Sequence, residues 1–155
     1  MTDQLFNIVL VEPEIPNNTG NIGRTCVGTN SALHLVEPFG FEINDKQLRR
    51  AGLDYWGDLT WKTYKDFDQL WQQIPDKTRA FFMTTKSQKP IYSLNFQKGD
   101  WFIFGKETKG LNSDILSLQP ENNMTLPMPG PIRSYNLANS VAITAMEGVR
   151  QLLHA

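Results

Sequence analysis

The chain has few of the residue types that build disulfide frameworks and transition-metal sites. Among its 155 residues there are one cysteine, Cys26, and two histidines, His34 and His154. One cysteine excludes an internal disulfide framework and suits a reducing compartment, and two histidines with one cysteine argue against a zinc-type centre. We therefore expect a site whose chemistry needs no metal.

Excess basic charge and long hydrophobic runs are also absent. The net charge is −1 at pH 7, so a nucleic-acid partner would have to meet a local basic patch. No apolar run approaches the roughly 20 residues that cross a bilayer, and the short run at 5–11 has no basic stretch before it and Glu12 directly after it. We expect a soluble, cytoplasmic protein with no signal peptide and no membrane partner, folded as one domain over residues 1–155.

Short runs of β-branched, leucine and aromatic residues predict the strands of a parallel sheet, with helices between them. Strands are expected over 5–11, 32–36, 59–64, 80–84 and 101–104, and helices over 45–51, 66–73 and 137–153, with a further helix after the first strand. Asn17, Asn18 or Thr19 is expected to cap that first helix, with Arg24 in its first or second turn. Because the first strand, this helix and the second strand fill about thirty residues, the size of a βαβ unit, the predicted fold class is α/β.

Three strand-type runs lead into loops of unusual composition, which read PNNTGNIGR at 16–24, GKETKGL at 105–111 and LPMPGPIRSYN at 126–136. In an open parallel sheet such loops meet at the carboxyl edge, where ligands bind. Glycine after a buried strand lets a ligand approach the backbone closely, and a proline-rich segment cannot enter a helix or a central strand. We expect the three loops to form one site made largely of backbone groups.

The third loop ends at a predicted helix N-terminus, where Ser134 or Asn136 can cap the first turn and Arg133 stands at the junction. Such a junction suits a polar or anionic ligand. Each loop alone is more simply an ordinary turn before a capped helix, and Gly20 and Gly23 do not complete the G-x-G-x-x-G pattern of dinucleotide-binding folds. Only the three loops together favour a site.

A basic patch is expected on the short helix at 45–51, where Lys46, Arg49 and Arg50 lie close together ahead of Tyr55 and Trp56. The cationic side chains could hold phosphates while the aromatic rings stack on bases. The alternative is a solvated helix face with both rings packed as a lid, and the local pattern alone favours this second reading.

The last predicted helix, over 137–153, carries its polar residues on one stripe and apolar or small residues over most of the remaining surface. A helix of this kind normally covers two surfaces. One should be the sheet and the other a partner, and an isologous homodimer through this helix is the simplest such partner.

Three motifs and one further stretch extend over nearly the whole chain, namely PNNTGNIGR (16–24), FGKETKGL (104–111), LPMPGPIRSYNLANSVAI (126–143) and LRRAGLDYW (48–56). In this order and spacing the chain resembles the SPOUT superfamily of RNA methyltransferases, and within it the small tRNA wobble-ribose 2′-O-methyltransferases of the TrmL/YibK type. The resemblance implies an α/β knot fold with a C-terminal trefoil knot. It also implies S-adenosylmethionine bound in the knot, S-adenosylhomocysteine as product, and a homodimer with its sites near the interface. Knots are otherwise almost absent from proteins, so periodicity could not have predicted one.

The resemblance also assigns roles to individual residues. The cofactor-binding residues would be Met83, Gly105, Leu126 and Ser134, with the backbone of Thr84, Glu107 and Ile132 close to the cofactor. The catalytic residues would be Arg24, Arg133, Ser134 and Asn136. The phosphates of the tRNA anticodon arm would be held by Arg24, Lys46, Arg49, Arg50, Lys106 and Lys109. Binding to tRNA should therefore weaken as salt rises.

The implied function is methyl transfer from S-adenosylmethionine to the ribose 2′-hydroxyl of the wobble nucleotide of tRNA, a cytidine or a modified uridine at position 34. The reaction needs in-line positioning and the removal of a proton from a weakly acidic alcohol. Arginine is an unusual base because its guanidinium holds its proton so firmly. Arg24 is therefore expected either to stabilise a phosphate and the oxyanion or to be made basic by its neighbours.

Two positions depart from the family pattern. Met146 stands where relatives often carry tyrosine, and SYNLA at 134–138 replaces the familiar Ser-Leu/Met-Asn-Leu-Ser. The hydroxyl of Tyr135 could lie close to the reacting groups. Two alternatives stay open. One is an enzyme with the same chemistry that acts on another tRNA position or on ribosomal RNA, and the other is a non-catalytic dimeric factor for RNA binding or assembly.

Overall fold

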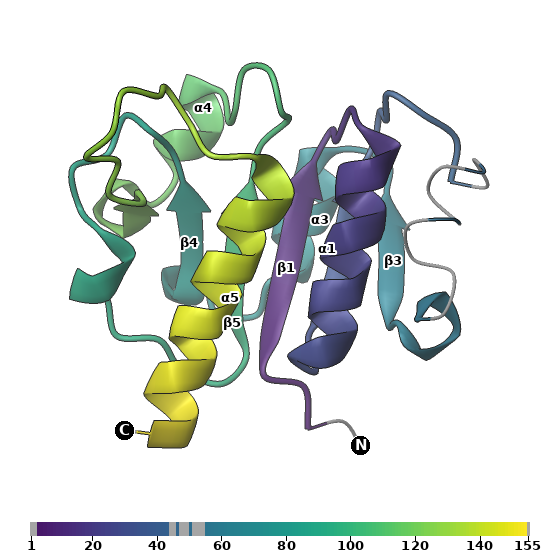
Figure 1. Ribbon diagram of the computed structural model, residues 1–155, viewed down its shortest axis with the longest axis horizontal. Helices are drawn as coiled ribbons and strands as arrows, with labels where there is room; N and C mark the ends of the chain where they lie inside the picture. Colours follow the sequence, from purple (N-terminus) through teal and green to yellow (C-terminus); the bar gives the residue numbers. More distant parts are fainter. Residues whose placement is uncertain (1–2, 44–45, 47–49, 51–54, 155) are drawn as a thin grey trace.

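The protein folds around one parallel sheet. The structure, a computed structural model, describes residues 3–43, 46, 50 and 55–154. Within them six strands lie in the order β3-β2-β1-β5-β4-β6, and every neighbouring pair is parallel (Figure 1). The strands are β1 Phe6–Val11, β2 Ala32–Val36, β3 Trp61–Tyr64, β4 Ala80–Met83, β5 Asp100–Phe104 and β6 Asn123–Met124. The predicted α/β class with a parallel sheet is confirmed, and the trefoil knot stays a prediction.

Helices cover both faces of this sheet. The α-helices given by the described residues are α1 Pro16–Gly28, α3 Phe67–Gln73, α4 Ser113–Leu116 and α5 Leu137–His154. Short 3-10 turns occur at η1 Trp56–Asp58, η2 Lys77–Arg79, η3 Ile91–Ser93 and η4 Pro120–Asn122. Helices α1 and α5 lie on one face, and α3 and α4 on the other (Figure 1). The helix predicted at 45–51 falls largely outside the described residues. None of the helices described here is long and apolar enough to span a bilayer.

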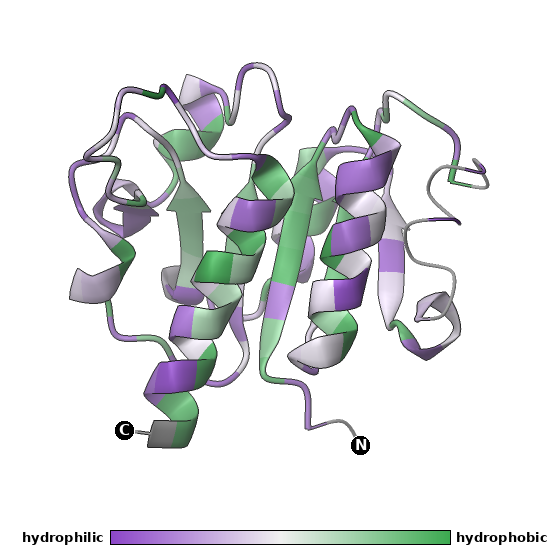
Figure 2. Cartoon of the chain, in the orientation of Figure 1, coloured by the Kyte–Doolittle hydropathy of each residue, from purple (hydrophilic) through white to green (hydrophobic). Residues whose placement is uncertain are grey.

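Two hydrophobic cores lie on the two faces of the sheet because side chains alternate along each strand. In β1, Ile8 and Leu10 pack in the core under α1 and α5, whereas Val9 and Val11 pack in the core under α3 and α4. A strand buried on both faces is largely apolar, which is why β1 appears in the sequence as a run with one polar residue, Asn7. Figure 2 shows β4 and most of β1 as hydrophobic. Cys26 lies fully buried in the first core, and burial raises the pKa of its thiol, so it packs as a small apolar side chain.

The start of α5 agrees with the sequence, and the start of α1 does not. The Oδ1 atom of Asn136 accepts from the N–H of Asn139 at 3.1 Å, as predicted for a cap of α5. Helix α1 begins at Pro16, and the residue before it makes no side-chain cap bond, so the caps predicted at 17–19 are wrong. Proline is pre-organised for the first helical position because its φ is fixed there. Arg24 consequently falls in the third turn of α1, further from the loop than predicted.

Candidate active site at the carboxyl edge of the sheet

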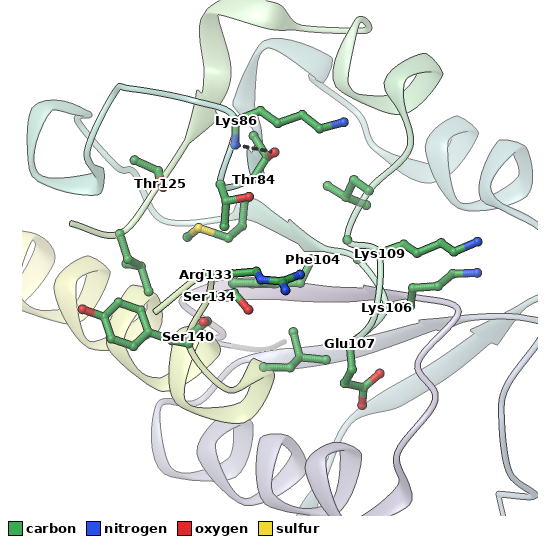
Figure 3. A pocket seen from close by; sticks show the side chains of 18 of the residues that line it. Thr84, Lys86, Phe104, Lys106, Glu107, Lys109, Thr125, Arg133, Ser134 and Ser140 are labelled. Atoms are coloured by element: carbon green, nitrogen blue, oxygen red, sulfur yellow. Dashed lines mark hydrogen bonds between the residues drawn. The ribbon is translucent and has the colours of Figure 1, made fainter. Parts of the chain in front are cut away.

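A cavity of about 290 Å³ opens at the carboxyl ends of β4, β5 and β6 (Figure 3). Its walls come from four segments that follow these strands. They are the end of β4 with the loop after it, the loop between β5 and α4, the loop between β6 and α5, and the first turns of α5. Because the strands are parallel, their following loops meet at this edge, as the sequence predicts.

The loop after β5 depends on two glycines. A Cβ atom added to Gly105 would lie 2.1 Å from the carbonyl carbon of Gly110 and 2.3 Å from the backbone nitrogen of Leu111. Gly110 has a φ of +66°, and its N–H donates to the carbonyl of Lys106 at 3.0 Å. The chain therefore folds back on itself so closely that backbone, rather than side chains, forms this wall of the cavity.

The side chain of Glu107 joins this loop to the start of α1. Its carboxylate accepts from the backbone N–H of Glu14 at 2.8 Å, from that of Ile15 at 3.0 Å, and from the Nδ2 group of Asn18 at 3.1 Å. These N–H groups lie at or just ahead of the N-terminus of α1, where negative charge is favoured. Glu107 thus supplies from about ninety residues away the stabilisation that no local cap provides.

Asn18 carries the connection on to the third loop. Its Oδ1 atom accepts from the Nδ2 group of Asn136 at 3.1 Å, and Asn136 in turn caps α5. One continuous series of hydrogen bonds therefore joins the β1–α1, β5–α4 and β6–α5 loops. Its members are Glu107, Asn18 and Asn136, and it fixes two helix N-termini relative to the cavity wall.

A second set of contacts joins the same two loops nearer to the solvent. The Glu14 carboxylate accepts from the N–H of Thr108 and from its hydroxyl, each at 2.9 Å, and the Thr108 N–H lowers the pKa of Glu14. Lys106 Nζ lies 3.0 Å from a Glu12 carboxylate oxygen, and this hydrogen bond raises the pKa of Lys106. Lys106 is therefore engaged within the protein, and its role as a phosphate contact stays a prediction.

The loop between β6 and α5 is closed by Tyr135. Its hydroxyl donates to the carbonyl of Pro127 at 2.8 Å, and its side chain lines the cavity. The hydroxyl that the sequence places near the reacting groups is thus engaged in holding the loop. Figure 3 shows Arg133 extending over the cavity toward the β5–α4 loop, with Ser134 beside it.

The structure brings most of the predicted site residues together. Of the predicted cofactor-binding residues, those that line the cavity are Met83, Thr84, Gly105, Glu107, Leu126 and Ser134. The side chain of Ile132 is not among them, since it is 52% exposed on the outside of the loop. Of the predicted catalytic residues, Arg133 and Ser134 line the cavity, whereas Asn136 is exposed and does not line it. Their chemical roles stay predictions.

The predicted RNA-binding residues are more widely spread. Lys106 and Lys109 line the cavity, whereas Lys46 and Arg50 are exposed elsewhere, and Arg49 lies outside the described residues. Arg24 is exposed on α1 and does not line the cavity; its guanidinium carbon lies 4.6 Å from the ring centroid of Tyr55. These cations could contact one tRNA only if it extended well beyond the cavity.

Several lining residues were not predicted as part of the site. They are Thr85, Lys86, Phe104, Thr108, Thr125, Met128 and Ser140. The sequence holds a signal for Lys86, because the polar stretch TTKSQKP follows the buried strand β4 and so belongs at the same edge of the sheet. No group of three or more histidine, cysteine or acidic side chains that could hold a metal occurs among the described residues, and metal independence stays a prediction.

Comparison with known proteins agrees with this geometry. Residues 5–146 match the model of the SpoU rRNA Methylase family. A tRNA (cytidine(34)-2′-O)-methyltransferase of Burkholderia pseudomallei (strain 1106a) is 44% identical over 149 residues, which are 95% of this chain and 96% of that protein. A solved structure that gives structural insights into the 2-OH methylation of C/U34 on tRNA superposes with a TM-score of 0.94, at 36% identity over 99% of both chains.

The fold also occurs in larger and more distant proteins. The SpoU methyltransferase AviRb from Streptomyces viridochromogenes, solved in complex with the cofactor AdoMet, superposes with a TM-score of 0.86 at 19% identity. The alignment covers 99% of this chain and 59% of AviRb. At this identity the likeness concerns the fold alone.

Proposed function

Since the chain belongs to the SpoU rRNA Methylase family, we propose that it transfers a methyl group from S-adenosylmethionine to the ribose 2′-hydroxyl of nucleotide 34 of tRNA. The observation that carries the proposal is agreement along the full length of the chain, in sequence and in structure, with proteins that act on this nucleotide. The chain is an enzyme of the tRNA (cytidine(34)-2′-O)-methyltransferase type, as the motifs at 16–24, 104–111 and 126–143 predict.

The lining of the cavity supports S-adenosylmethionine as its ligand, and its volume of about 290 Å³ is close to the lower end of the usual range. Small-molecule cavities are mostly apolar, of roughly 300–1,000 Å³, with a few polar groups that fix orientation. Met83, Phe104 and Leu126 supply apolar surface, and the close turn at Gly105 presents backbone groups. When bound, the cofactor supplies an electrophilic methyl group. AviRb, which shares the fold, was solved with AdoMet, and we extend that ligand to this chain.

The residues of the chain act by positioning the ribose and by stabilising charge. Arg133 and Ser134 lie at the cavity, where a guanidinium and a hydroxyl can hold the reacting nucleotide. Orientation of two reacting groups can supply roughly 7–11 kcal/mol of a barrier. We assign Asn136 to positioning rather than to contact with substrate, because its side chain is already engaged with Asn18 and with the first turn of α5.

We infer a homodimer through α5. On its outward face Ile143 is 41% exposed, Met146 is 57% exposed and Leu153 is 63% exposed, and their spacing of three and seven places them on one stripe. Figure 2 shows apolar segments on this side of α5, away from the sheet. A second copy would cover the stripe by an isologous contact. Met146 would then contribute apolar surface to the interface.

The partner RNA would be the anticodon arm of tRNA, in the cytoplasm. Cations at the cavity suit its phosphates, and Lys109 and Arg133, which line the cavity, are exposed. Arg24 would act on a phosphate or on the developing oxyanion. Since Arg24 does not line the cavity of its own chain, the Arg24 side chain of a second copy would have to reach the ribose bound at this cavity. Dimerisation would therefore complete the site.

The proposal is tested by incubating the protein with labelled S-adenosylmethionine and total tRNA. We expect S-adenosylhomocysteine to raise the melting temperature, because a ligand that binds only the folded state stabilises it. We expect label to enter tRNA, with at least a tenfold lower rate for Arg133→Ala. The matched control is Lys65→Ala, which removes an exposed cation away from the cavity and should leave the rate unchanged. Stabilisation without transfer to tRNA would redirect the search to ribosomal RNA. Absence of both stabilisation and transfer would favour a non-catalytic RNA-binding factor.

A further inference from the structure

Arg24 contacts an aromatic ring, whereas Arg79 and Arg150 each pair with a carboxylate. The guanidinium carbon of Arg24 lies 4.6 Å from the centroid of the Tyr55 ring. Arg79, in contrast, donates to both carboxylate oxygens of Asp100, and Arg150 donates to both of Glu147. Among the residues that the structure describes, no carboxylate lies within ion-pair distance of Arg24.

The difference matters for what each arginine can bind. A carboxylate that pairs with a guanidinium occupies its N–H donors and offsets its charge. An aromatic ring contacts only the flat face of the guanidinium, so the positive charge and the donors at its edge stay available. Arg24 is exposed and Tyr55 is half-buried, so the ring supports a guanidinium that solvent can reach. Such a side chain suits an oxygen of a nucleic-acid backbone.

The packing of the next residue places Tyr55. Trp56 opens the turn η1, and Gly23 of α1 leaves room for its ring, since an added Cβ atom would lie 3.2 Å from Trp56 Cζ3. The ring of Trp56 lies 5.2 Å from that of Trp61 at the start of β3, the edge strand of the sheet (Figure 1). Gly23 of α1 therefore packs against Trp56, and the next residue, Arg24, contacts Tyr55, which precedes Trp56. The contact of Tyr55 with Arg24 is thus built on a packed support.

We propose that Tyr55 is a positioning residue that acts through Arg24, holding the guanidinium so that its donor edge meets the tRNA backbone. The inference rests on the proposed function, in which Arg24 acts on tRNA. Tyr55 does not contact the reacting atoms; it narrows the positions that the flexible arginine side chain occupies. Cation–π contacts of this kind change an equilibrium by about 2- to 30-fold, which sets the effect expected when the ring is removed.

The test is a double-mutant cycle on the single-turnover rate of methyl transfer to tRNA, with enzyme in excess. Tyr55→Leu is expected to lower the rate by about 2- to 30-fold, whereas Tyr55→Phe, which keeps the ring, restores it to within about twofold. In an Arg24→Ala background, Tyr55→Leu should cause no further loss, because residues that act through one another are not additive. Tyr55→Gln is measured alongside as a second variant without a ring, so the cycle stands if one of the two fails to fold.

The controls separate the possible outcomes. Stabilisation by S-adenosylhomocysteine should be the same in all Tyr55 variants, and Tyr92→Leu, which removes a tyrosine that is 62% exposed elsewhere, should leave the rate unchanged. The inference is overturned if Tyr55→Leu lowers the rate equally with and without Arg24, or if Tyr55→Phe is as slow as Tyr55→Leu. In both cases wild-type protein still methylates tRNA. Absence of transfer by the wild type would instead contradict the proposed function.

Discussion

Glu107→Gln tests whether one carboxylate holds the site together. The wild-type carboxylate accepts three hydrogen bonds, from the N–H groups of Glu14 and Ile15 and from the amide of Asn18, at 2.8 to 3.1 Å. Glutamine offers only one acceptor oxygen, and its NH₂ group would face an N–H donor. Loss of the charge also removes the favourable interaction with the N-terminus of α1. Hydrogen bonds to charged groups contribute about 1.5–3 kcal/mol each, and the side chain is partly exposed, so we expect the free energy of unfolding to fall by about 2–3 kcal/mol.

This loss is measured by denaturant unfolding at pH 7 and by thermal melting. For a chain of this size it corresponds to a melting temperature lower by about 5–10 °C. Stabilisation by S-adenosylhomocysteine should also weaken, because Glu107 lines the cavity. Glu121→Gln is the matched control, since Glu121 is exposed on η4. If Glu107→Gln unfolds within about 0.5 kcal/mol of the wild type, as surface substitutions do, the hydrogen bonds that join the loops do not hold the site.

Three further predictions concern single residues. Burial lowers the pKa of His34 from 6.5 to about 4, so between these pH values the unfolded chain binds more protons than the folded chain. The free energy of unfolding should therefore fall by about 3 kcal/mol as pH drops from 7 to 4. In denaturant titrations, His34→Gln should make the free energy of unfolding depend less on pH. Gly105→Ala should abolish the rise in melting temperature that S-adenosylhomocysteine causes, because the added Cβ atom would lie 2.1 Å from the backbone of Gly110. The control Gly28→Ala, which has open space around it, should keep this rise. Tyr135→Phe removes the bond to the carbonyl of Pro127 and should weaken cofactor affinity about 2- to 10-fold in calorimetry; unchanged affinity would show that this bond does not shape the cavity.

The sequence predicts the local features of this fold well. Each predicted strand lies within two residues of an observed one. For β1, β2, β4 and β5, which are buried on both faces, the signal is a largely apolar run. The cap of α5 by Asn136 is a contact across three residues, and such contacts depend on composition that can be read directly. The meeting of the loops at one edge follows from parallel strands alone.

Features that depend on distant residues could not be predicted in this way. Helix α1 begins at Pro16, and the N–H groups at its start are paired not by a local cap but by Glu107, 92 residues from Ile15. Lys106 is engaged by Glu12, 94 residues away, and this ion pair could not be predicted from the sequence. Neither pair carries any periodicity or spacing that marks it in the sequence. The roles of the site residues came from the resemblance to a family rather than from composition.

The most direct test of the proposed function uses two tRNA transcripts that differ at one atom. One carries ribose at nucleotide 34, and the other carries 2′-deoxyribose there, so that only the accepting hydroxyl is missing. We expect methyl transfer from S-adenosylmethionine to the first, with the label mapped to nucleotide 34, and none to the second. Equal transfer to both transcripts would contradict the assignment of nucleotide 34 as the target.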